Sequence, residues 1–394
     1  MKWHKKNQQD EFIQLLEIHC KKTENPNLLK QIVDSRKTTI SRKLIESNQG
    51  NLAHIFSTDI AFNIIGKIPC STLPQHYFVI EQLAQKLFGC LLTCWTEFEI
   101  FRTIQNSALS NKHTNQFQTT ASSVIHEDYH YELVRDISQD QRYFYTEFTD
   151  QPLLLSDAIV LINIATFIKQ HKWYEMLNLL DVSSKGEHFI LYQMDEQIKK
   201  PMIISSALIE HYQDKENWLF FDSFFLTEQW NKYDITPSLQ HFSPQLKSRL
   251  TLSKNKNTMM CSSVLENAIY SSIVDKKRVC GVIRFTINGP KRKLNHFLYL
   301  AQKGLANALY NSGRDMIFSI IEQPAMILFY QAMNSIETEH MPFIFTSSQD
   351  INSSGLITYK GICLTKNASY VFNQYDFKEY NVKIIQRRKE LKQQ

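Results

Sequence analysis

The stretch that decides the fold reads DMIFSII over Asp315–Ile321, and Glu322 and Gln323 follow it directly. Its mostly apolar residues predict a buried strand. Pro324 then opens AMILFYQAMNS, an amphipathic pattern that predicts a helix ending near Asn334, because proline is favoured at a first helical position. A carboxylate between a buried strand and a helix start lies where α/β folds place their chemistry, so Glu322 is the first catalytic candidate.

A second strand is predicted upstream, at Val279–Ile287, where VCGVIRFTI precedes the turn sequence NGP at residues 288–290. Arg284 lies inside this otherwise apolar run. Because a guanidinium stays charged, a buried arginine needs an anion or several carbonyl groups as partners. Arg284 is therefore a candidate to hold a substrate carboxylate or to tune Glu322, and a structural ion pair is the alternative.

The strand and helix around Glu322 resemble a unit of the GCN5-related N-acyltransferase (GNAT) fold. The helix of that unit carries an Asn-x-x-Ala-x-x-x-Tyr pattern; here Gln323 and Met326 replace the Asn and the Ala, and Tyr330 matches the Tyr. The run GVIRFTINGP is similar to the GC-x-RL…TT-x-P strand of autoinducer synthases. With its length and two-part layout, the chain resembles the LuxM/AinS/VanM type of acyl-homoserine-lactone synthase.

This resemblance implies an enzyme that transfers an acyl group from acyl-CoA or acyl carrier protein to the amine of S-adenosylmethionine. Lactone closure would release methylthioadenosine, and the product would serve quorum sensing in a bacterium. S-adenosylmethionine is then a substrate, and no cofactor or metal is expected. In this fold the sheet splays between two central strands, so that backbone N–H groups can meet an oxyanion. The strands that carry Arg284 and Glu322 are the candidates for that pair.

Each catalytic candidate has a chemical role and a structural alternative. Glu322 could act as the base or bind the substrate ammonium, or it could only stabilise the start of a helix. Tyr330 could protonate the leaving thiolate, or it could be a core aromatic residue.

Candidate substrate-binding residues come from three further segments. TEQWNKYDI weakly resembles the Trp and acidic residues of the other autoinducer synthase family, and LFFDSFF places an acid within a predicted strand. NGPKRK stands where acetyltransferases have a glycine-rich loop for pyrophosphate, so its cations could bind the acyl donor, whose identity stays open. Together with the neighbour of Arg284, the candidates are Asp222, Trp230, Asp234, Phe285, Lys291 and Arg292.

A competing motif is His126-Glu127-Asp128-Tyr129-His130, a literal His-Glu-x-x-His sequence. On a helix it would place two imidazoles on one face for zinc, with the glutamate as general base of a metallohydrolase. The polar flanks favour a surface helix over a zinc site. A third possibility is a non-catalytic protein, in which a helical interaction module is fused to a degenerate acyltransferase fold.

Helical periodicity covers residues 10–110, in which Phe78–Phe101 predicts one long helix, and returns at Val124–Asp136 and Asp157–Leu180. Short β-rich runs follow, among them Trp218–Leu226, and strands then alternate with helices. The predicted fold is therefore α/β (α+β). A mainly helical domain over residues 1–185 precedes a mixed, GNAT-like sheet flanked by helices over residues 186–394.

Composition narrows the functional classes. A chain of 394 residues is long enough for two domains, and its net charge of +5 lacks the clustered excess typical of nucleic-acid binding. Seven cysteines without paired spacing favour reduced thiols. The N-terminus lacks the apolar stretch of a signal peptide, and the apolar run Leu153–Ile168 is short for a membrane span. A cytoplasmic location is therefore expected.

Overall fold

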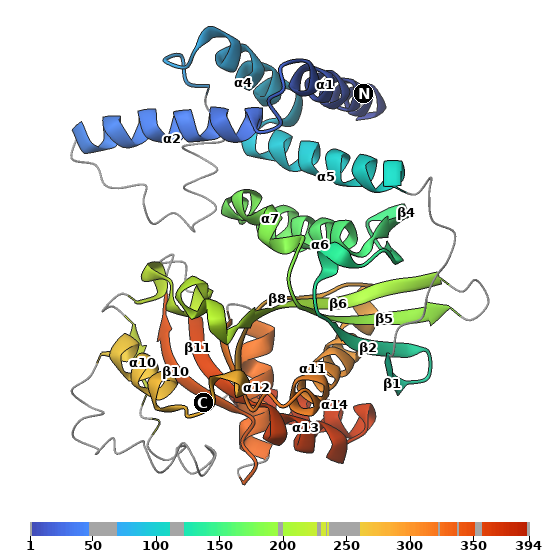
Figure 1. The fold of residues 1–394 in the computed structure, drawn as a ribbon, viewed down its shortest axis with the longest axis vertical. Helices are drawn as coiled ribbons and strands as arrows, with labels where there is room; N and C mark the ends of the chain where they lie inside the picture. The colour runs from blue at the N-terminus through green and yellow to red at the C-terminus, as the bar shows by residue number, and fades with distance from the viewer. Residues whose placement is uncertain are drawn as a thin grey trace. The chain divides into compact units, whose positions relative to one another are not determined.

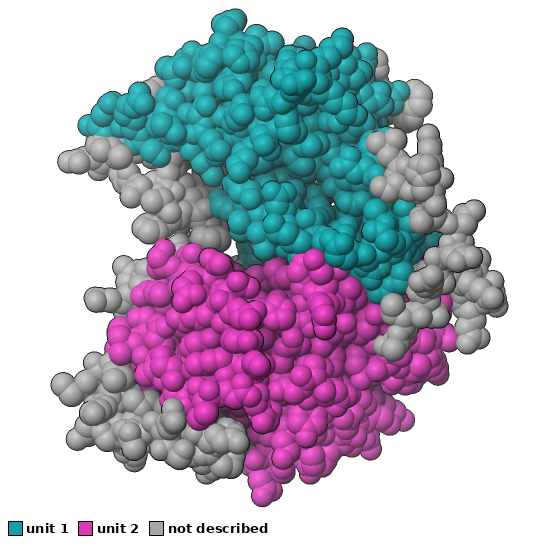
Figure 2. Space-filling model, viewed as in Figure 1, with its two compact units in different colours: residues 1–118, 138–185 teal, residues 119–137, 186–394 magenta. Residues whose placement is uncertain are grey.

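The computed structural model describes residues 2–46, 69–110, 122–195, 200–226, 230–233, 235, 261–321, 324–336, 339–350 and 357–391. Its contacts divide the chain into two compact units, shown in Figure 2. Unit 1 comprises residues 1–118 and 138–185, and unit 2 comprises residues 119–137 and 186–394. Residues 119–137, predicted to lie in the first domain, thus belong to unit 2.

Unit 1 is mainly helical (Figure 1). Its helices α1, α2, α4, α5, α6 and α7 span Lys2–Lys22, Leu28–Glu46, Gln75–Phe88, Leu91–Ser110, Leu155–Asn163 and Leu180–Ser183. The hairpin β3–β4, Tyr143–Thr146 and Thr149–Leu154, precedes α6, and a π-helical segment Ile164–Gln170 and a 3-10 helix Tyr174–Leu179 follow it. One apolar core that includes Leu16, Ile32, Trp95 and Ile164 joins α1, α2, α5 and the π-helical segment.

The helix predicted at Phe78–Phe101 is in fact two helices. Gly89 ends α4 with a φ of 76°, and its N–H donates to the carbonyl oxygen of Gln85 at 2.9 Å. A left-handed glycine of this kind is a common helix end. The apolar residues of this stretch are therefore divided between two helices that pack on one core.

Unit 2 is built on a mixed sheet with the strand order β1-β2-β5-β6-β8-β9-β11-β10-β7. These strands, in chain order, span Ser123–His126, Tyr129–Val134, His188–Asp195, Lys200–His211, Asn231–Lys232, Val279–Ile287, Met316–Ile321, Phe343–Gln349 and Thr358–Leu364. Neighbouring strands are antiparallel except β8 and β9, which are parallel. The mixed sheet with helices confirms the predicted α+β class.

Helices cover both faces of this sheet. α11, α12, α13 and α14, which span Leu294–Asn311, Pro324–Ile336, Thr365–Gln374 and Phe377–Leu391, form one core with residues such as Phe189 and Val282 (Figure 1). α10, Ser262–Ser272, and the 3-10 turn Leu219–Phe221 form a second core with Phe318 and Ile362. We call these the α11 face and the α10 face of the sheet.

Three further predicted elements differ from the structure. Val124–Asp136 is the β1–β2 hairpin and not a helix, because Glu127 turns the chain with a φ of 44°. Trp218–Leu226 forms two short 3-10 turns and not a strand, since its aromatic rings pack between α10 and Phe318 of the sheet instead of extending a strand ladder. The C-terminal run KIIQRRKELKQQ, whose polar composition predicts a frayed end, is helical in α14 up to Leu391.

No helix within the described residues is long and apolar enough to cross a membrane.

Candidate active site

The ladder between the two central strands of unit 2 ends early. β8 and β9 pair only through Val279–Met316, Cys280–Ile317 and Gly281–Phe318. Beyond this point β8 follows β6 as far as Ile287, and β9 follows β11 as far as Ile321. The facing edges of β8 and β9 therefore separate. The predicted neighbourhood of these two strands is confirmed, and we call the ends of β8 and β9 beyond their shared ladder the strand opening.

Arg284 lies at a bulge on the β8 side of the strand opening. Ser206 pairs with Thr286 and Leu208 with Ile283, so β6 opposes Arg284 and Phe285 with one residue only. Arg284 takes a φ of 55°, which is unusual for a side chain of its size. Such a conformation costs about 1–3 kcal/mol and clusters at functional sites. A bulge of this kind re-aims a side chain and loosens the ladder.

A carboxylate that the sequence analysis did not single out lies beside this bulge. Glu210, on β6, pairs with Gly281 in the ladder. A β-carbon at residue 281 would collide with Oε2 of Glu210, so glycine leaves the space that this carboxylate occupies. The Oε1 atom accepts a hydrogen bond of 3.0 Å from the N–H of Leu219. The Oε2 atom is buried and has no hydrogen-bond partner among the described residues.

The environment of Glu210 shifts its titration toward neutrality. Burial raises the pKa of this carboxyl to about 7, and the Leu219 N–H and the Arg284 charge oppose the shift only in part. A general base works best when its pKa lies near the working pH. Glu210 therefore has the properties of a base that is partly ionised at neutral pH and has one oxygen without a partner among the residues that the structure describes.

Arg284 supplies a cation next to this carboxyl. Burial lowers the pKa of its guanidinium to about 10, and the charge of Glu210 opposes the shift. Arg284 thus remains protonated at neutral pH. A half-buried guanidinium at the strand opening can bind a carboxylate in a bidentate geometry.

A buried histidine completes the polar groups on this side. His188 opens β5, is 1% exposed, and its Nδ1 lies 3.1 Å from the carbonyl oxygen of Gly186. Since a carbonyl can only accept, Nδ1 carries the proton. Burial and the nearby Arg284 charge together lower the pKa of His188 to about 4, and the hydrogen bond to Gly186 opposes the shift only in part. The neutral ring has an acceptor at Nε2, which has no partner among the residues described.

Of the two other catalytic candidates, Glu322 and Tyr330, the structure describes only Tyr330. Glu322 follows the end of β9 and lies outside the described residues. Tyr330, on α12, is buried; its hydroxyl donates to Oε1 of Gln302 at 2.7 Å, and its ring stacks on Phe343. Burial raises the pKa of Tyr330 well above its ordinary value. These contacts favour a packing role for Tyr330, because a strongly raised pKa makes it a weak proton donor.

Two of the substrate-binding candidates lie in the interior. Trp230 is 4% exposed, and Nζ of Lys360 lies 5.4 Å from the centre of its ring. Nζ of Lys360 also forms a buried ion pair of 2.5 Å with Glu266. A protein cation therefore already occupies the ring face that a substrate sulfonium would need. Phe285 packs on the α11 face of the sheet.

The remaining candidates lie elsewhere. Asp222 is exposed between the two 3-10 turns and not inside a strand, which corrects the predicted position. Asp234 lies outside the described residues. Lys291 and Arg292 are exposed in the 3-10 turn that precedes α11.

The structure does not contain the helix that the zinc alternative requires at residues 126–130. His126 ends β1 and His130 lies on β2, so the two imidazoles are on paired strands and not on one helix face. No group of three or more histidine, cysteine or acidic side chains in the described part of the chain could hold a metal ion.

Sequence reasoning missed Glu210 and His188. The available signal for Glu210 was an acid at the end of the apolar run MIISSALIE. The glycine of VCGVI that accommodates this acid lies on a strand far away in the sequence, so their relation becomes visible only through the pairing of β6 with β8.

Comparisons with known proteins agree with the earlier resemblance. A family model described as acyl homoserine lactone synthase matches residues 7–393. Proteins named acyl-homoserine-lactone synthase LuxM from Vibrio campbellii and Vibrio harveyi are 32% and 31% identical, over 91% of this chain and 86% of each relative. OpaM of Vibrio parahaemolyticus is 28% identical over 92% of this chain and 88% of its own. No solved structure matches the chain significantly.

Proposed function

The chain belongs to the acyl homoserine lactone synthase family, and on this premise we propose that it makes its lactone from S-adenosylmethionine and an acyl thioester. The enzyme is thus an acyltransferase whose product serves as an autoinducer in quorum sensing. The observation that carries the proposal is the strand opening, where a carboxyl with a pKa of about 7 lies beside a half-buried guanidinium.

Amide formation needs a base, an oxyanion site and a leaving group. The α-ammonium of S-adenosylmethionine must lose a proton before its nitrogen attacks, and the ionised Glu210 can accept that proton. As the C–N bond forms, the thioester carbonyl becomes an oxyanion, which backbone N–H groups at the separated strand edges can bind. The C–S bond of the thioester then breaks, and the thiolate leaves and takes up a proton from the nitrogen.

Lactone closure follows without a strong acid or base. A carboxylate oxygen of the acylated intermediate attacks its own γ-carbon, and the bond from that carbon to the sulfonium breaks. Methylthioadenosine leaves as a neutral thioether, so the step depends mainly on positioning. We assign the binding of this carboxylate to Arg284, because a guanidinium suits a planar carboxylate. Glu322 stays a candidate for the substrate ammonium.

The acyl donor and the location complete the proposal. The exposed cations Lys291 and Arg292 could attract the phosphates of coenzyme A or the acidic surface of an acyl carrier protein. Acyl-CoA, acyl carrier protein and S-adenosylmethionine are all found in the cell interior, so we place the enzyme in the cytoplasm.

Mass spectrometry of the products tests this function. Purified chain is incubated with S-adenosylmethionine and either acyl-CoA or acyl carrier protein loaded with the same acyl group. We expect an acyl-homoserine lactone and methylthioadenosine in equal amounts, with the faster donor identified by the rate. Thioester hydrolysis without methylthioadenosine, with both donors, would refute the proposed reaction.

A further inference from the structure

A polar cavity lies within unit 1, built by the loop after α1, by α2, α5 and α6, and by the segment from the 3-10 helix Tyr174–Leu179 to Ser184. Its volume is about 230 Å³. This is room for a small organic molecule or several water molecules. No step of the proposed reaction uses this cavity.

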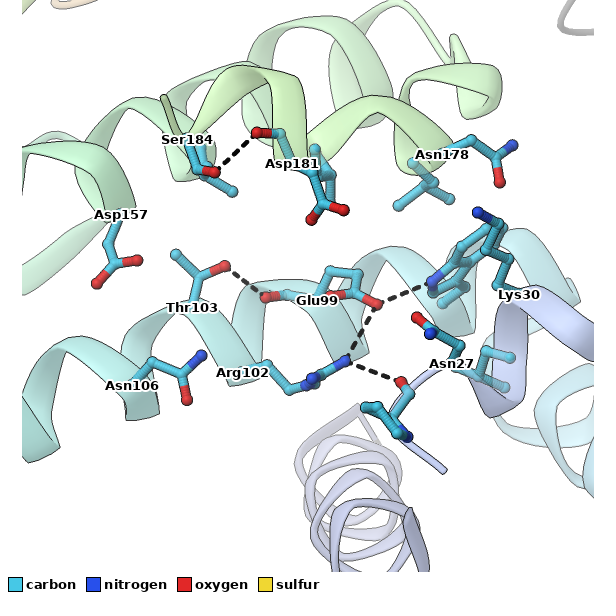
Figure 3. A pocket seen from close by; sticks show the side chains of 16 residues that line it. Asn27, Lys30, Glu99, Arg102, Thr103, Asn106, Asp157, Asn178, Asp181 and Ser184 are labelled. Atoms are coloured by element: carbon cyan, nitrogen blue, oxygen red, sulfur yellow. Dashed lines mark hydrogen bonds and ion pairs between the residues drawn. The ribbon is translucent and has the colours of Figure 1, made fainter. Parts of the chain in front are cut away.

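Three carboxylates line the cavity from two sides. Figure 3 shows Asp181 pointing from its short helix toward Glu99 on α5, with Asp157 of α6 further along the same cavity. Glu99 accepts a hydrogen bond of 2.9 Å from Nε1 of Trp95, so its carboxylate is held in place at the cavity wall. Acids on opposite walls favour a cation between them.

The cations of the wall compensate these acids only in part. Arg102 lies 3.7 Å from Glu17 and 3.8 Å from Glu99, and it donates at 3.0 Å to the carbonyl oxygen of Pro26. Its charge is thus shared with an acid outside the cavity lining. Lys30 is exposed at the rim.

Two further observations show polar groups on this wall that the described residues do not fully satisfy. Oδ1 of Asn178, on the same wall as Asp181, is buried and has no hydrogen-bond partner within the described ranges. Burial also raises the pKa of Glu99 and that of Asp157, so their charged forms lack full compensation. A buried acceptor and poorly compensated acids are both satisfied by a donor that carries positive charge.

We propose that this cavity binds a small organic ammonium ion, whose N–H groups donate to Glu99, Asp181 and Asn178. The aliphatic part of the ligand would lie on the indole of Trp95 and on Leu177. An ammonium with a short carbon chain fits the volume and matches the mixture of carboxylate, amide and apolar wall. All residues that line this site belong to unit 1, whereas the strand opening belongs to unit 2.

Calorimetric titration of the full chain with probes matched in size tests the site. The probes are 1,4-diaminobutane, which is cationic, and 1,4-butanediol, its neutral counterpart. We expect one diamine bound per chain and at least about tenfold weaker binding of the diol, as for a charge pair lost from a partly buried site. Equal affinity for the two probes, or no binding of the diamine, would overturn the proposal.

Matched variants separate the cavity from general surface charge. Glu99→Gln and Asp181→Asn keep the side-chain shape, and each should weaken diamine binding at least about fivefold. Glu97→Gln, on the same helix, is the control, because Glu97 pairs with Lys169 and does not line the cavity. An equal effect of all three variants would assign the binding to surface charge and refute the site. Far-UV circular dichroism checks that each variant is folded.

Discussion

At the scale of single residues, the position of the Glu210 carboxylate depends on the absence of a side chain at Gly281. The carboxylate of Glu210 occupies the space that any side chain at residue 281 would need. The buried Oε2 and the raised pKa follow from that close fit between two strands. A glycine in the middle of a strand weakens it, so its presence here points to a local demand for space.

Gly281→Ala should therefore reduce activity and stability together. The new β-carbon would push the Glu210 carboxylate aside and overpack the strand, at a cost of about 1–3 kcal/mol in the free energy of unfolding. The control is Gly89→Ala, which places a side chain in open space at a left-handed helix end and costs about 1–2 kcal/mol. Turnover and thermal melts of both variants are the measurement. Equal turnover of the two alanine variants would contradict the role of Gly281.

The raised pKa of Glu210 also predicts how stability changes with pH. The folded state holds the proton of Glu210 more tightly than the unfolded state, because its pKa is about 7 instead of the ordinary 4.5. The wild type should thus lose stability as the pH rises from 4.5 to 7. Glu210→Gln removes this loss. The melting temperature of the variant minus that of the wild type should therefore increase from pH 4.5 to pH 7. A difference that is constant with pH would show that Glu210 titrates normally.

At the scale of elements, the bulge on β8 links backbone strain to the site. Arg284 has a left-handed backbone conformation within a strand, and the bulge coincides with the place where β8 has left β9. A regular strand would continue the parallel ladder and close the opening. The bulge thus places a guanidinium at the edge where backbone groups are needed for an oxyanion.

Replacing Arg284 by glycine and by alanine separates strain from chemistry. Both variants lose the guanidinium and should lose turnover by about a hundredfold. Glycine accepts a positive φ without cost, so Arg284→Gly should be more stable than Arg284→Ala by about 1 kcal/mol, opposite to the usual order in strands. Denaturant unfolding measures the difference. A more stable alanine variant would mean that the positive φ is not maintained in solution.

The elements that sequence predicts well are those with strong local signals. The strands predicted at Val279–Ile287 and Asp315–Ile321 are observed with the expected bounds to within one residue, because apolar, β-branched residues and the elements that follow them agree there. The hairpin at Glu127 was predicted as a helix, since its turn contains no glycine or asparagine. Glu210 was missed because its burial depends on a strand far away in the sequence.

The β1–β2 hairpin leads to a prediction about metal. His126 and His130 lie on paired strands, so they cannot form the helical zinc motif. The purified protein should contain no stoichiometric zinc by elemental analysis, and the double variant His126→Ala/His130→Ala should keep its synthase turnover. One zinc ion per chain, with activity lost on chelation, would restore the metallohydrolase alternative.

At the scale of the whole molecule, the chain combines a helical unit with a unit built on a mixed sheet. The family match extends over residues 7–393, so both units belong to the synthase family. The strand opening lies in the sheet unit, and the proposed ammonium site lies in the helical unit. The two proposals are independent, because neither rests on how the units are placed.

The central claim is that Glu210 is the base at the strand opening. The most direct measurement is the pH dependence of kcat/KM for methylthioadenosine release by wild type and Glu210→Gln, with the exposed Glu216→Gln as control. For the wild type and the control we predict a rate that rises with pH through about 7, where Glu210 loses its proton. Glu210→Gln should be at least about a hundredfold slower and lack this rise. A Glu210→Gln variant with the wild-type rate and profile would contradict the account.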